Sequence, residues 1–288
     1  MLTIDPAQIP TKDLHQYILG AVAPRPIAFA STVSDDGVPN LAPYSFFNAF
    51  SSNPPILIFS SNRRVENNTT KDTLKNVQDT GEVVINVVPY AIVRQMALCS
   101  VEYGADVDEF KKAGFTPLRS ERVRPFRVAE SPVQMECVVE QILPLGEKGG
   151  AGNLIVCRMV LMHIAESVLA EGGRIDPHKI DLVGRMGRFY YARASGEAVV
   201  EIAQKVTDLG VGFDALPEHL LRSSVLTGNE LARIAALTVL PDRADALADP
   251  QVQAALVGNP AREAVHQLIR EALAQNDVTL AAKLALGG

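Results

Sequence analysis

The chain has 288 residues, of which 47% are hydrophobic, and a formal net charge of -6. A chain of this length buries one large core, or a core plus a smaller second domain. Its 27 basic and 33 acidic residues are mixed along the sequence, without the basic stripe that binding to nucleic acid or to an anionic membrane requires. We therefore expect neither a nucleic acid nor a membrane as a partner.

The N-terminal stretch MLTIDPAQIPTKD lacks the basic start and apolar run of a signal peptide. No segment approaches the roughly 18 apolar residues of a membrane-spanning helix, so we expect a soluble, cytoplasmic protein. The three cysteines, Cys99, Cys137 and Cys157, have no C-x-x-C spacing, which argues against a metal cage or a disulfide framework. We expect all three to be buried apolar side chains.

From about residue 23 to residue 164, short β-branched runs alternate with turn residues, as is typical of an all-β barrel or sandwich. In the first hairpin, residues 26–34 pair with residues 38–47 across a turn in which Gly37 supplies positive φ. Pro43 lies within the returning strand and has no N–H for a ladder, so we predict a break or bulge there. Further strands are expected over residues 56–60, 82–88, 131–145 and 153–167.

Short helices are expected among these strands. In residues 68–81, Leu74 and Val77 have helical spacing, and Gly81 stands where a C-terminal cap would lie. Two more helices are predicted, over residues 91–100 and 106–114.

Beyond residue 196 the pattern changes to helices rich in alanine and leucine, so the sequence divides into a domain of residues 1–196 and a helical segment of residues 197–288. The prolines at 217, 241, 250 and 260 fall between these helices or at their starts. We predict helices over residues 197–206, 229–237, 244–256 and 262–275. Charged residues expected on their outer faces are Glu197, Glu201, Arg233, Arg262, Glu263 and Arg270. The apolar stripes would pack on one another, on the first domain or on a second subunit.

Hydroxyl side chains at strand ends precede the helix that begins near Lys71. A helix N-terminus offers free N–H groups and partial positive charge, so a lysine and hydroxyls beside it make an anion site suited to a phosphate monoester. Alternatively, Asp72 or Thr70 is an ordinary helix cap and Lys71 is solvated. The spacing of these residues leaves both interpretations open.

Three segments carry a resemblance to a known family: PRPIAFASTVSDDGVPNLAPYSFFNAFSSNPPILIFS (24–60), KDTLKNVQDTGEVVINVV (71–88) and GRIDPHKIDLVGRMGRFYYAR (173–193). Together they resemble the flavin reductase-like FMN-binding split-barrel family, of the flavoredoxin kind, over about residues 10 to 195. The resemblance implies a mainly β fold, a six-stranded Greek-key split β-barrel with short inserted helices. It also implies a homodimer with FMN bound in a groove beside the dimer interface.

Carried over to this sequence, the resemblance implies that Thr32 and the corner Pro43-Tyr44-Ser45-Phe46 line the flavin ring. It also implies the residues that hold the ribityl phosphate, which are Ser45, Ser60, Ser61 and the helix start Lys71-Asp72-Thr73. A proline at the corner would free backbone groups for the polar edge of the isoalloxazine. The alternative for the aromatic residues Phe46, Phe47 and Phe50 is core packing.

The resemblance implies an oxidoreductase, an NAD(P)H:flavin reductase whose reduced FMN serves a partner monooxygenase or another electron acceptor. The alternative is a non-catalytic flavoprotein, a flavoredoxin-like electron carrier that does not bind NAD(P)H. In related flavin reductases a histidine associated with nicotinamide binding stands at the position of Asn153, and this departure favours the carrier. A third interpretation is a flavin-dependent reductase of a particular organic compound, with the helical segment contributing to substrate selection.

Three further side chains are singled out, and the roles of two of them, Arg185 and Tyr190, stay open. His163, at the other end of the strand that starts at Asn153, is expected to be structural rather than a proton donor. Arg185 and Tyr190 either reach the groove or contact the second subunit. The helical segment either restricts which acceptor reaches the flavin or reinforces the dimer.

The sequence has no G-x-G-x-x-G between a strand and a helix, so a separate Rossmann domain is not expected.

Overall fold

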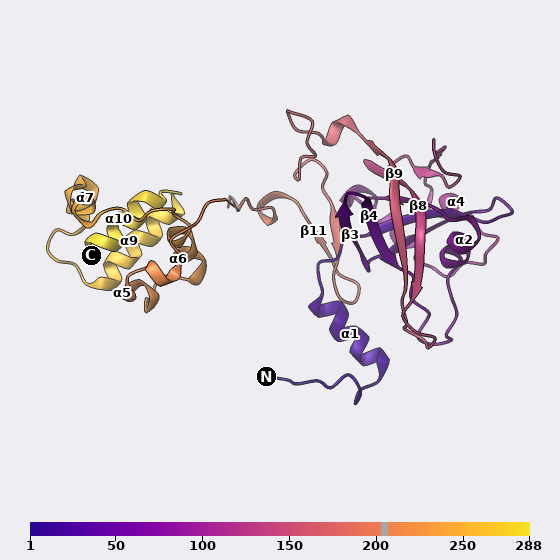
Figure 1. Ribbon diagram of the computed structural model, residues 1–288, viewed down its shortest axis with the longest axis horizontal. Coiled ribbons are helices and arrows are strands. Elements are labelled where there is room, and N and C mark those ends of the chain that lie inside the picture. Colours follow the sequence, from indigo (N-terminus) through magenta and orange to yellow (C-terminus); the bar gives the residue numbers. More distant parts are fainter. Residues whose placement is uncertain (203–206) are drawn as a thin grey trace. The chain divides into compact units, whose positions relative to one another are not determined.

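The computed structural model describes residues 1–202 and 207–288. These residues form two compact units, Met1–Val200 and Glu201–Gly288, which Figure 1 shows as a strand-rich body and a helical body. Each unit has its own hydrophobic core, so each is described by itself.

The first unit is built on one antiparallel sheet with the strand order β2-β1-β5-β8-β9-β4-β3 among the described residues. Its strands are β1 (Ala28–Val33), β2 (Pro39–Tyr44), β3 (Phe47–Ser52), β4 (Pro55–Ser60), β5 (Glu82–Asn86), β8 (Val133–Pro144) and β9 (Asn153–Ile164). This confirms the predicted mainly β, Greek-key split barrel. The sheet has seven strands, whereas the resemblance implies six, because the chain from residue 39 to residue 52 divides into β2 and β3.

The predicted break at Pro43 is wrong. β2 pairs with β1 in an unbroken register from Val33↔Pro39 to Ala28↔Tyr44. β2 lies at the edge of the sheet, and alternate N–H groups of an edge strand point away from its neighbour. The N–H of Leu41 points outward in this way and donates to Glu109 Oε2 at 3.0 Å. Position 43 has the same orientation, so its proline costs no ladder hydrogen bond. The strand ends after Tyr44, and a register shift lies in β3, between Ala49 and Ser51.

Strand β1 is buried along its whole length, because it has packed side chains on both faces. Ala28 and Ala30 belong to the barrel interior with Phe59, Val83 and other residues of the sheet. Phe29 faces a second cluster, formed with residues of the inserted helices such as Met96 and Phe110. A strand covered on both sides has a continuous apolar run rather than an alternating pattern.

Four α-helices belong to the first unit in the described part: α1 (Thr11–Ala21), α2 (Asp72–Thr80), α3 (Val93–Leu98) and α4 (Glu109–Ala113). The last three confirm the predicted inserted helices. α2 buries Leu74 and Val77 and ends at Gly81, whose φ of 68° is left-handed, as the predicted cap requires. α1 was not predicted. It lies apart from α2 and α4 in Figure 1 and has no buried residue.

Short strands complete this unit: β6 (Pro117–Leu118), β7 (Arg127–Val128), β10 (Val183–Arg185) and β11 (Tyr191–Arg193). β10 and β11 form a hairpin of their own. Backbone hydrogen bonds join that hairpin to the segment just before β1. Arg25 N donates to Arg185 O at 3.0 Å, and Arg185 N donates to Arg25 O at 2.8 Å. Residues far apart in the sequence are thereby brought to one side of the unit.

The second unit contains α5 (Glu218–Leu221), α6 (Gly228–Ala235), α7 (Arg243–Ala248), α8 (Pro250–Ala255), α9 (Arg262–Ala274) and α10 (Val278–Gly287). Three of the predicted helical stretches are confirmed, with 244–256 divided at Asp249. The helix predicted over 197–206 is wrong where it can be seen, because only Gly196–Ala198 forms a turn of 3-10 helix and residues 199–202 are not helical. Residues 203–206 lie outside the described residues.

The apolar stripes of this second unit pack on one another. Its core includes Leu220, Ile234, Val252, Ile269 and Leu273, all fully or nearly fully buried. Some charged side chains expected on outer faces join the helices instead. Arg270 Nε pairs with Glu230 Oε1 at 2.8 Å, and Arg233 Nη1 donates to Leu273 O at 2.6 Å. The described helices of this unit therefore form a core of their own.

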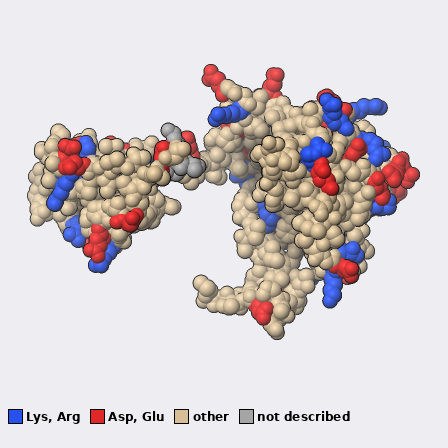
Figure 2. All heavy atoms as spheres, viewed as in Figure 1, with Lys and Arg blue, Asp and Glu red and all other residues tan. Residues whose placement is uncertain are grey.

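All three cysteines are free and buried, as predicted. Burial raises the pKa of Cys99 and of Cys137 to about 12, so these thiols stay protonated and unreactive. None of the described helices has the length and apolar character needed to cross a membrane. Figure 2 shows Lys and Arg interspersed with Asp and Glu over the face in view, and few charges around α1.

Candidate functional site

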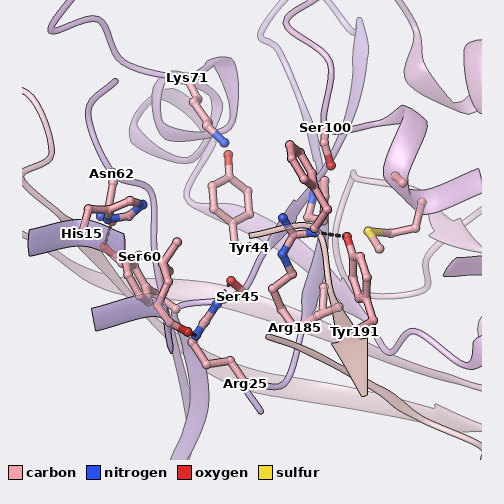
Figure 3. Close-up of a pocket in the computed structure, with 17 residues that line it drawn as sticks. His15, Arg25, Tyr44, Ser45, Ser60, Asn62, Lys71, Ser100, Arg185 and Tyr191 are labelled. Atoms are coloured by element: carbon pink, nitrogen blue, oxygen red, sulfur yellow. Dashed lines mark hydrogen bonds between the residues drawn. The ribbon is translucent and has the colours of Figure 1, made fainter. Parts of the chain in front are cut away.

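A cavity of about 480 Å³ opens in the first unit beside the corner between β2 and β3. α1, the start of β1, the corner, the end of β4, α3 and the β10–β11 hairpin each contribute side chains to it (Figure 3). The described lining residues include three permanent or nearly permanent cations, Arg25, Lys71 and Arg185, and no carboxylate. The cavity therefore has the charge of a site for an anionic ligand.

The structure brings six of the ten predicted site residues into this cavity: Pro43, Tyr44, Ser45, Phe46, Ser60 and Lys71. Asp72 and Thr73 line a smaller hollow of about 60 Å³, which shares Tyr44 and Lys71 with the main cavity. Ser61 is buried beside the cavity lining.

Thr32 lies away from the cavity. It is fully buried, and its Oγ1 accepts hydrogen bonds from Asn40 Nδ2 at 2.9 Å and from Asn76 Nδ2 at 3.1 Å. These bonds join β1 to β2 and α2, so Thr32 fixes the position of the helix that begins next to the cavity.

The start of α2 does not have the ordinary cap that formed the alternative interpretation. Lys71 occupies the N-cap position in extended conformation, and the helix start has no side-chain cap hydrogen bond. The Thr73 hydroxyl accepts from Asn40 Nδ2 at 2.9 Å. The N–H groups of the first turn thus lack the usual side-chain acceptor.

Lys71 is not a solvated surface lysine. Burial lowers its pKa, and so does the neighbouring Arg64, while Glu102 opposes the shift. Glu102 is already paired with Arg64, at 2.5 Å between Arg64 Nε and Glu102 Oε1. The Lys71 ammonium lies 4.9 Å from the centre of the Tyr44 ring, and Figure 3 shows it at the hydroxyl end of that ring.

Two buried hydroxyls, one beside this lysine and the other next to the first, have no hydrogen-bond partner among the described residues. They are Tyr44 Oη and Ser61 Oγ. Burial raises the pKa of Tyr44 to about 12, although the nearby Thr73 and Ser61 hydroxyls reduce the rise. The phenol is therefore protonated and can donate. A buried unpaired donor is costly, so the site fits a ligand that supplies acceptor oxygens.

Arg25 joins several parts of the cavity wall. Only 4% of the residue is exposed. Its guanidinium donates to the carbonyls of Leu19 (2.8 Å) and Val22 at the end of α1, and to that of Met186 (3.2 Å) in the β10–β11 hairpin. Nε also approaches Ser45 Oγ at 3.4 Å. Burial, and then the charge of Arg185, lower the pKa of Arg25.

Arg185 is held by its own hairpin. Nη1 donates to the Tyr191 hydroxyl, the dashed contact in Figure 3, and Nη2 donates to the Arg188 carbonyl at 2.5 Å. Its guanidinium lies 4.6 Å from the centre of the Tyr191 ring. The partners of both arginines are neutral oxygens, so neither charge is balanced by them.

His15 of α1 packs edge-on against Phe46, with 6.3 Å between ring centres. Burial, and then Arg25, lower the pKa of His15, so its ring is neutral near pH 7. Ser60 Oγ donates to Asn62 Oδ1 at 2.7 Å. The neutral groups of His15, Ser60 and Asn62 thus line the cavity together with the charged Arg25, which lies 5.9 Å from the centre of the Phe46 ring.

No sequence pattern had singled out His15, Arg25, Asn62, Ser100 and Tyr191 as lining residues. Arg25 and Tyr191 had one signal, since they stand in the first and the third of the family-like segments. Of the two residues with open roles, Arg185 lines the cavity. Tyr190 instead lines a separate hollow with Tyr17 of α1.

Asn153 and His163 both have structural contacts. Asn153 is buried, and its Nδ2 donates to Ser61 O at 2.9 Å, which holds the start of β9 against the end of β4. His163 Nε2 lies 2.7 Å from Oε1 of the fully buried Glu136, which confirms the expectation of a structural histidine.

The family model described as "Flavin reductase like domain" matches residues 20–183. An uncharacterized protein of Aquifex aeolicus is 37% identical over 189 residues, which cover 66% of this chain and 94% of that protein. Among solved structures, nitrilotriacetate monooxygenase component B from Bacillus cereus is 32% identical with a TM-score of 0.65, over 70% of this chain and 98% of that one. The 2-nitrobenzoate 2-nitroreductase NbaA of Pseudomonas fluorescens is 25% identical with a TM-score of 0.62, over 70% and 96% of the two chains.

Proposed function

The chain belongs to the flavin reductase-like family, and from that membership we propose that it is an FMN-binding, NAD(P)H-dependent flavin reductase. Its reduced flavin would serve an electron acceptor, such as a partner monooxygenase. The likeness to nitrilotriacetate monooxygenase component B supports a partner of that kind. The cavity volume of about 480 Å³ lies within the range of about 300 to 1,000 Å³ that small-molecule sites have.

The observation that carries this proposal is the group around Lys71. A half-buried ammonium that forms no ion pair in the described part of the chain lies beside the unpaired hydroxyl of Tyr44, and the unpaired Ser61 Oγ lies next to that hydroxyl. The start of α2 adds the N–H groups of its first turn. A phosphate monoester supplies both the negative charge and the acceptor oxygens that these groups lack. FMN has such a phosphate.

The corner between β2 and β3 would hold the flavin ring. In a regular antiparallel strand the N–H and C=O of one residue point to the same side, so the Pro43 carbonyl points away from β1, as its ring nitrogen does. Ile27, Phe46 and Met96 add apolar lining, which would exclude water from the ring. When bound, FMN supplies two-electron chemistry by accepting a hydride. The residues of this chain bind it and orient its face.

One observation favours a second candidate, a flavoprotein electron carrier that does not bind NAD(P)H. The position that related reductases use for a histidine is Asn153, whose amide is engaged with Ser61 O in a buried contact. Anaerobic mixing of the FMN-loaded protein with NADH or NADPH separates the two candidates. Fast bleaching of the flavin absorption supports the reductase, whereas slow bleaching supports the carrier.

Replacing Lys71 by alanine tests the phosphate site. We expect Lys71→Ala to weaken FMN binding by about 1.5 to 3 kcal/mol, the value of a charge-assisted contact, and to leave riboflavin binding unchanged, because riboflavin has no phosphate. Fluorescence titrations with both flavins measure this. Lys75→Ala is the matched control, since Lys75 lies one turn along α2 and pairs with Asp79 at 2.6 Å. Equal losses for FMN and riboflavin would remove Lys71 from the phosphate site.

A further inference from the structure

The cavity has positive charge on two sides of Tyr44. Figure 3 shows Lys71 on one side of this residue and the two arginines, Arg25 and Arg185, on the other. The phosphate proposed above would bind at Lys71. A single phosphate held there leaves the arginine pair without a counterion.

The protein does not balance this pair itself. The side-chain hydrogen bonds of Arg25 go to three backbone carbonyls and a serine hydroxyl. Those of Arg185 go to the Tyr191 hydroxyl and to a backbone carbonyl. Neither arginine has an ion-pair partner in the part of the chain that the structure describes, and the described cavity lining has no Asp or Glu. Two neighbouring cations without a carboxylate are unfavourable unless a ligand supplies the negative charge.

The two arginines differ in what they can offer a ligand. Arg25 is almost completely buried, and its donors are used to hold α1 and the hairpin in place. Arg185 is only partly buried, and the contacts to Tyr191 and Arg188 leave other N–H groups of its planar fork available. Such a fork matches the two oxygens of a carboxylate or of a phosphate.

Aromatic side chains line the same cavity as this fork, and Tyr191 is in contact with it. Phe46, Tyr191 and Phe189 all line the cavity, and Phe189 is 91% exposed in the single chain. An exposed aromatic side chain at a cavity mouth offers a face on which a planar ring can stack.

We propose that Arg185, with Arg25 adding charge behind it, binds the anionic group of the second substrate, a planar ring compound that carries a carboxylate or a phosphate. This inference rests on the proposed function, since the second substrate is the compound that exchanges electrons with the flavin. Two sources share this chemistry: a small aromatic acid, and the phosphate of a nicotinamide nucleotide.

The test uses the full-length protein with saturating FMN. Binding of benzoate, of its neutral analogue benzamide and of NADP⁺ is measured by calorimetry for the wild type and for Arg185→Gln. We expect the wild type to bind at least one of the two anions, and Arg185→Gln to bind it about 10- to 100-fold more weakly. Benzamide affinity should change little. If Arg185→Gln binds only benzoate more weakly, the site takes an aromatic acid. If it binds only NADP⁺ more weakly, the site takes the nucleotide. Weaker binding of both assigns the site to the anionic group that the two compounds share.

Arg188→Gln is the matched control. It removes the same charge from the same hairpin, but its side chain does not line the cavity, and the carbonyl that holds Arg185 is retained. Circular dichroism verifies that each variant is folded, and Arg185→Lys, which keeps the charge but loses the fork, should bind with intermediate affinity.

Two results would overturn the proposal. One is that the wild type binds neither anion, or that Arg185→Gln binds them as well as Arg188→Gln does. The other is that Arg185→Gln loses FMN itself, as seen in the visible spectrum, because Arg185 then belongs to the cofactor site. In that second case the proposed function stands. If Lys71→Ala binds FMN as tightly as the wild type does, the proposal that Lys71 holds the FMN phosphate is wrong. That result does not depend on the titrations with benzoate and NADP⁺.

Discussion

Glu136 is a buried carboxylate whose stability contribution can be measured. It is fully buried and accepts from Glu121 N (2.9 Å), Arg122 N (2.6 Å) and His163 Nε2 (2.7 Å). Burial alone would raise the pKa of Glu136, but these donors outweigh burial and lower it. The folded state thus favours the ionised form. This stability is present above the usual carboxyl pKa and is lost as the pH falls through the lowered value.

We therefore expect Glu136→Gln to lower the unfolding free energy of the first unit near neutral pH by about 1.5 to 3 kcal/mol. The difference in unfolding free energy between the wild type and this variant should shrink as the pH falls below about 4.5. Urea unfolding followed by tyrosine fluorescence measures both effects, because the chain has no tryptophan and all six tyrosines lie in the first unit. Glu140→Gln, on the same strand with a half-exposed carboxylate paired to Arg158, should cost much less. Equal costs would contradict this account of Glu136.

Individual site residues could be predicted only where a local motif includes them. The corner residues Tyr44 and Ser45, and Lys71, stand in family-like segments. Arg25 also stands in such a segment, but its place in the cavity depends on contacts with α1 and with a hairpin about 160 residues later, at Met186, which no local pattern contains. Thr32 was assigned to the flavin ring, but the structure places its side chain against Asn40 and Asn76.

At the scale of elements, a chain of hydrogen bonds joins α5, α9 and α10 in the second unit. Ser223 Oγ lies 2.8 Å from His266 Nδ1, His266 Nε2 lies 3.1 Å from His219 Nδ1, and His219 Nε2 lies 3.1 Å from Ala285 O. The carbonyl can only accept, so His219 Nε2 donates to it. When both rings are neutral, His266 Nε2 then donates to His219, and Ser223 donates to His266. A proton added to His219 Nδ1 would place an N–H of each ring opposite the other, and a proton added to His266 Nδ1 would compete with the two backbone N–H groups that Ser223 Oγ already accepts.

This arrangement predicts that acid loosens the second unit. Burial lowers the pKa of both His219 and His266. Arg262 contributes to both shifts. The Ala285 carbonyl opposes the shift of His219, whereas for His266 the neighbouring His219 adds to the shift and Glu263 opposes it. The two histidines line a surface hollow of the second unit. The other charged side chains of that hollow include Glu218, Arg222 and Glu263. Because the folded pKa values lie below 6.5, this stability is complete above about pH 6.5 and is lost as the pH falls below it.

Hydrogen exchange measured by mass spectrometry on the full chain tests this. Protection of peptides from α9, corrected for the intrinsic rate, should fall between pH 7.5 and pH 5.5. In His266→Gln the fall should be smaller, whereas His163→Gln, which changes the first unit, should leave it unaltered. Protection of α9 that does not change with pH in the wild type would disprove the role of the histidine chain.

Helices were predictable where the helical spacing of apolar residues in the sequence matches a face that is buried in the structure. α2, α3, α4, α6 and α9 each bury one face. Residues 197–202 have a helical pattern, but Val200 and Ile202 are 70% and 83% exposed. Short helices without tertiary packing are marginal in water. The sequence pattern alone could not show that this stretch lacks a packing partner within its unit.

At the scale of the whole molecule, a mainly apolar face remains open on the first unit. α1 exposes Tyr17, Ile18 and Val22, and the hairpin between β10 and β11 exposes Tyr190, at 69%. An apolar surface of this kind is typical of a protein–protein contact. We propose that a second copy covers it, since the same hairpin and helix also border the cavity and reduced flavin needs protection from solvent.

We therefore expect a dimer by light scattering at micromolar concentration, and a weaker dimer in Tyr190→Asp, because a charge there would be buried in the interface. Leu209→Asp is a matched control on an exposed leucine of the second unit. A wild-type monomer that still holds flavin would rule out this assembly.

The outer edge of β2 has a consequence for misassembly. An open sheet edge is a template on which further chains can add strands and aggregate. Along β2 the outward positions are Pro39, Leu41 and Pro43. The prolines have no N–H, and the N–H of Leu41 is occupied by Glu109. A foreign strand would find no free donor at these three positions, so the proline that borders the cavity also helps the barrel to resist fibrillar growth from this edge.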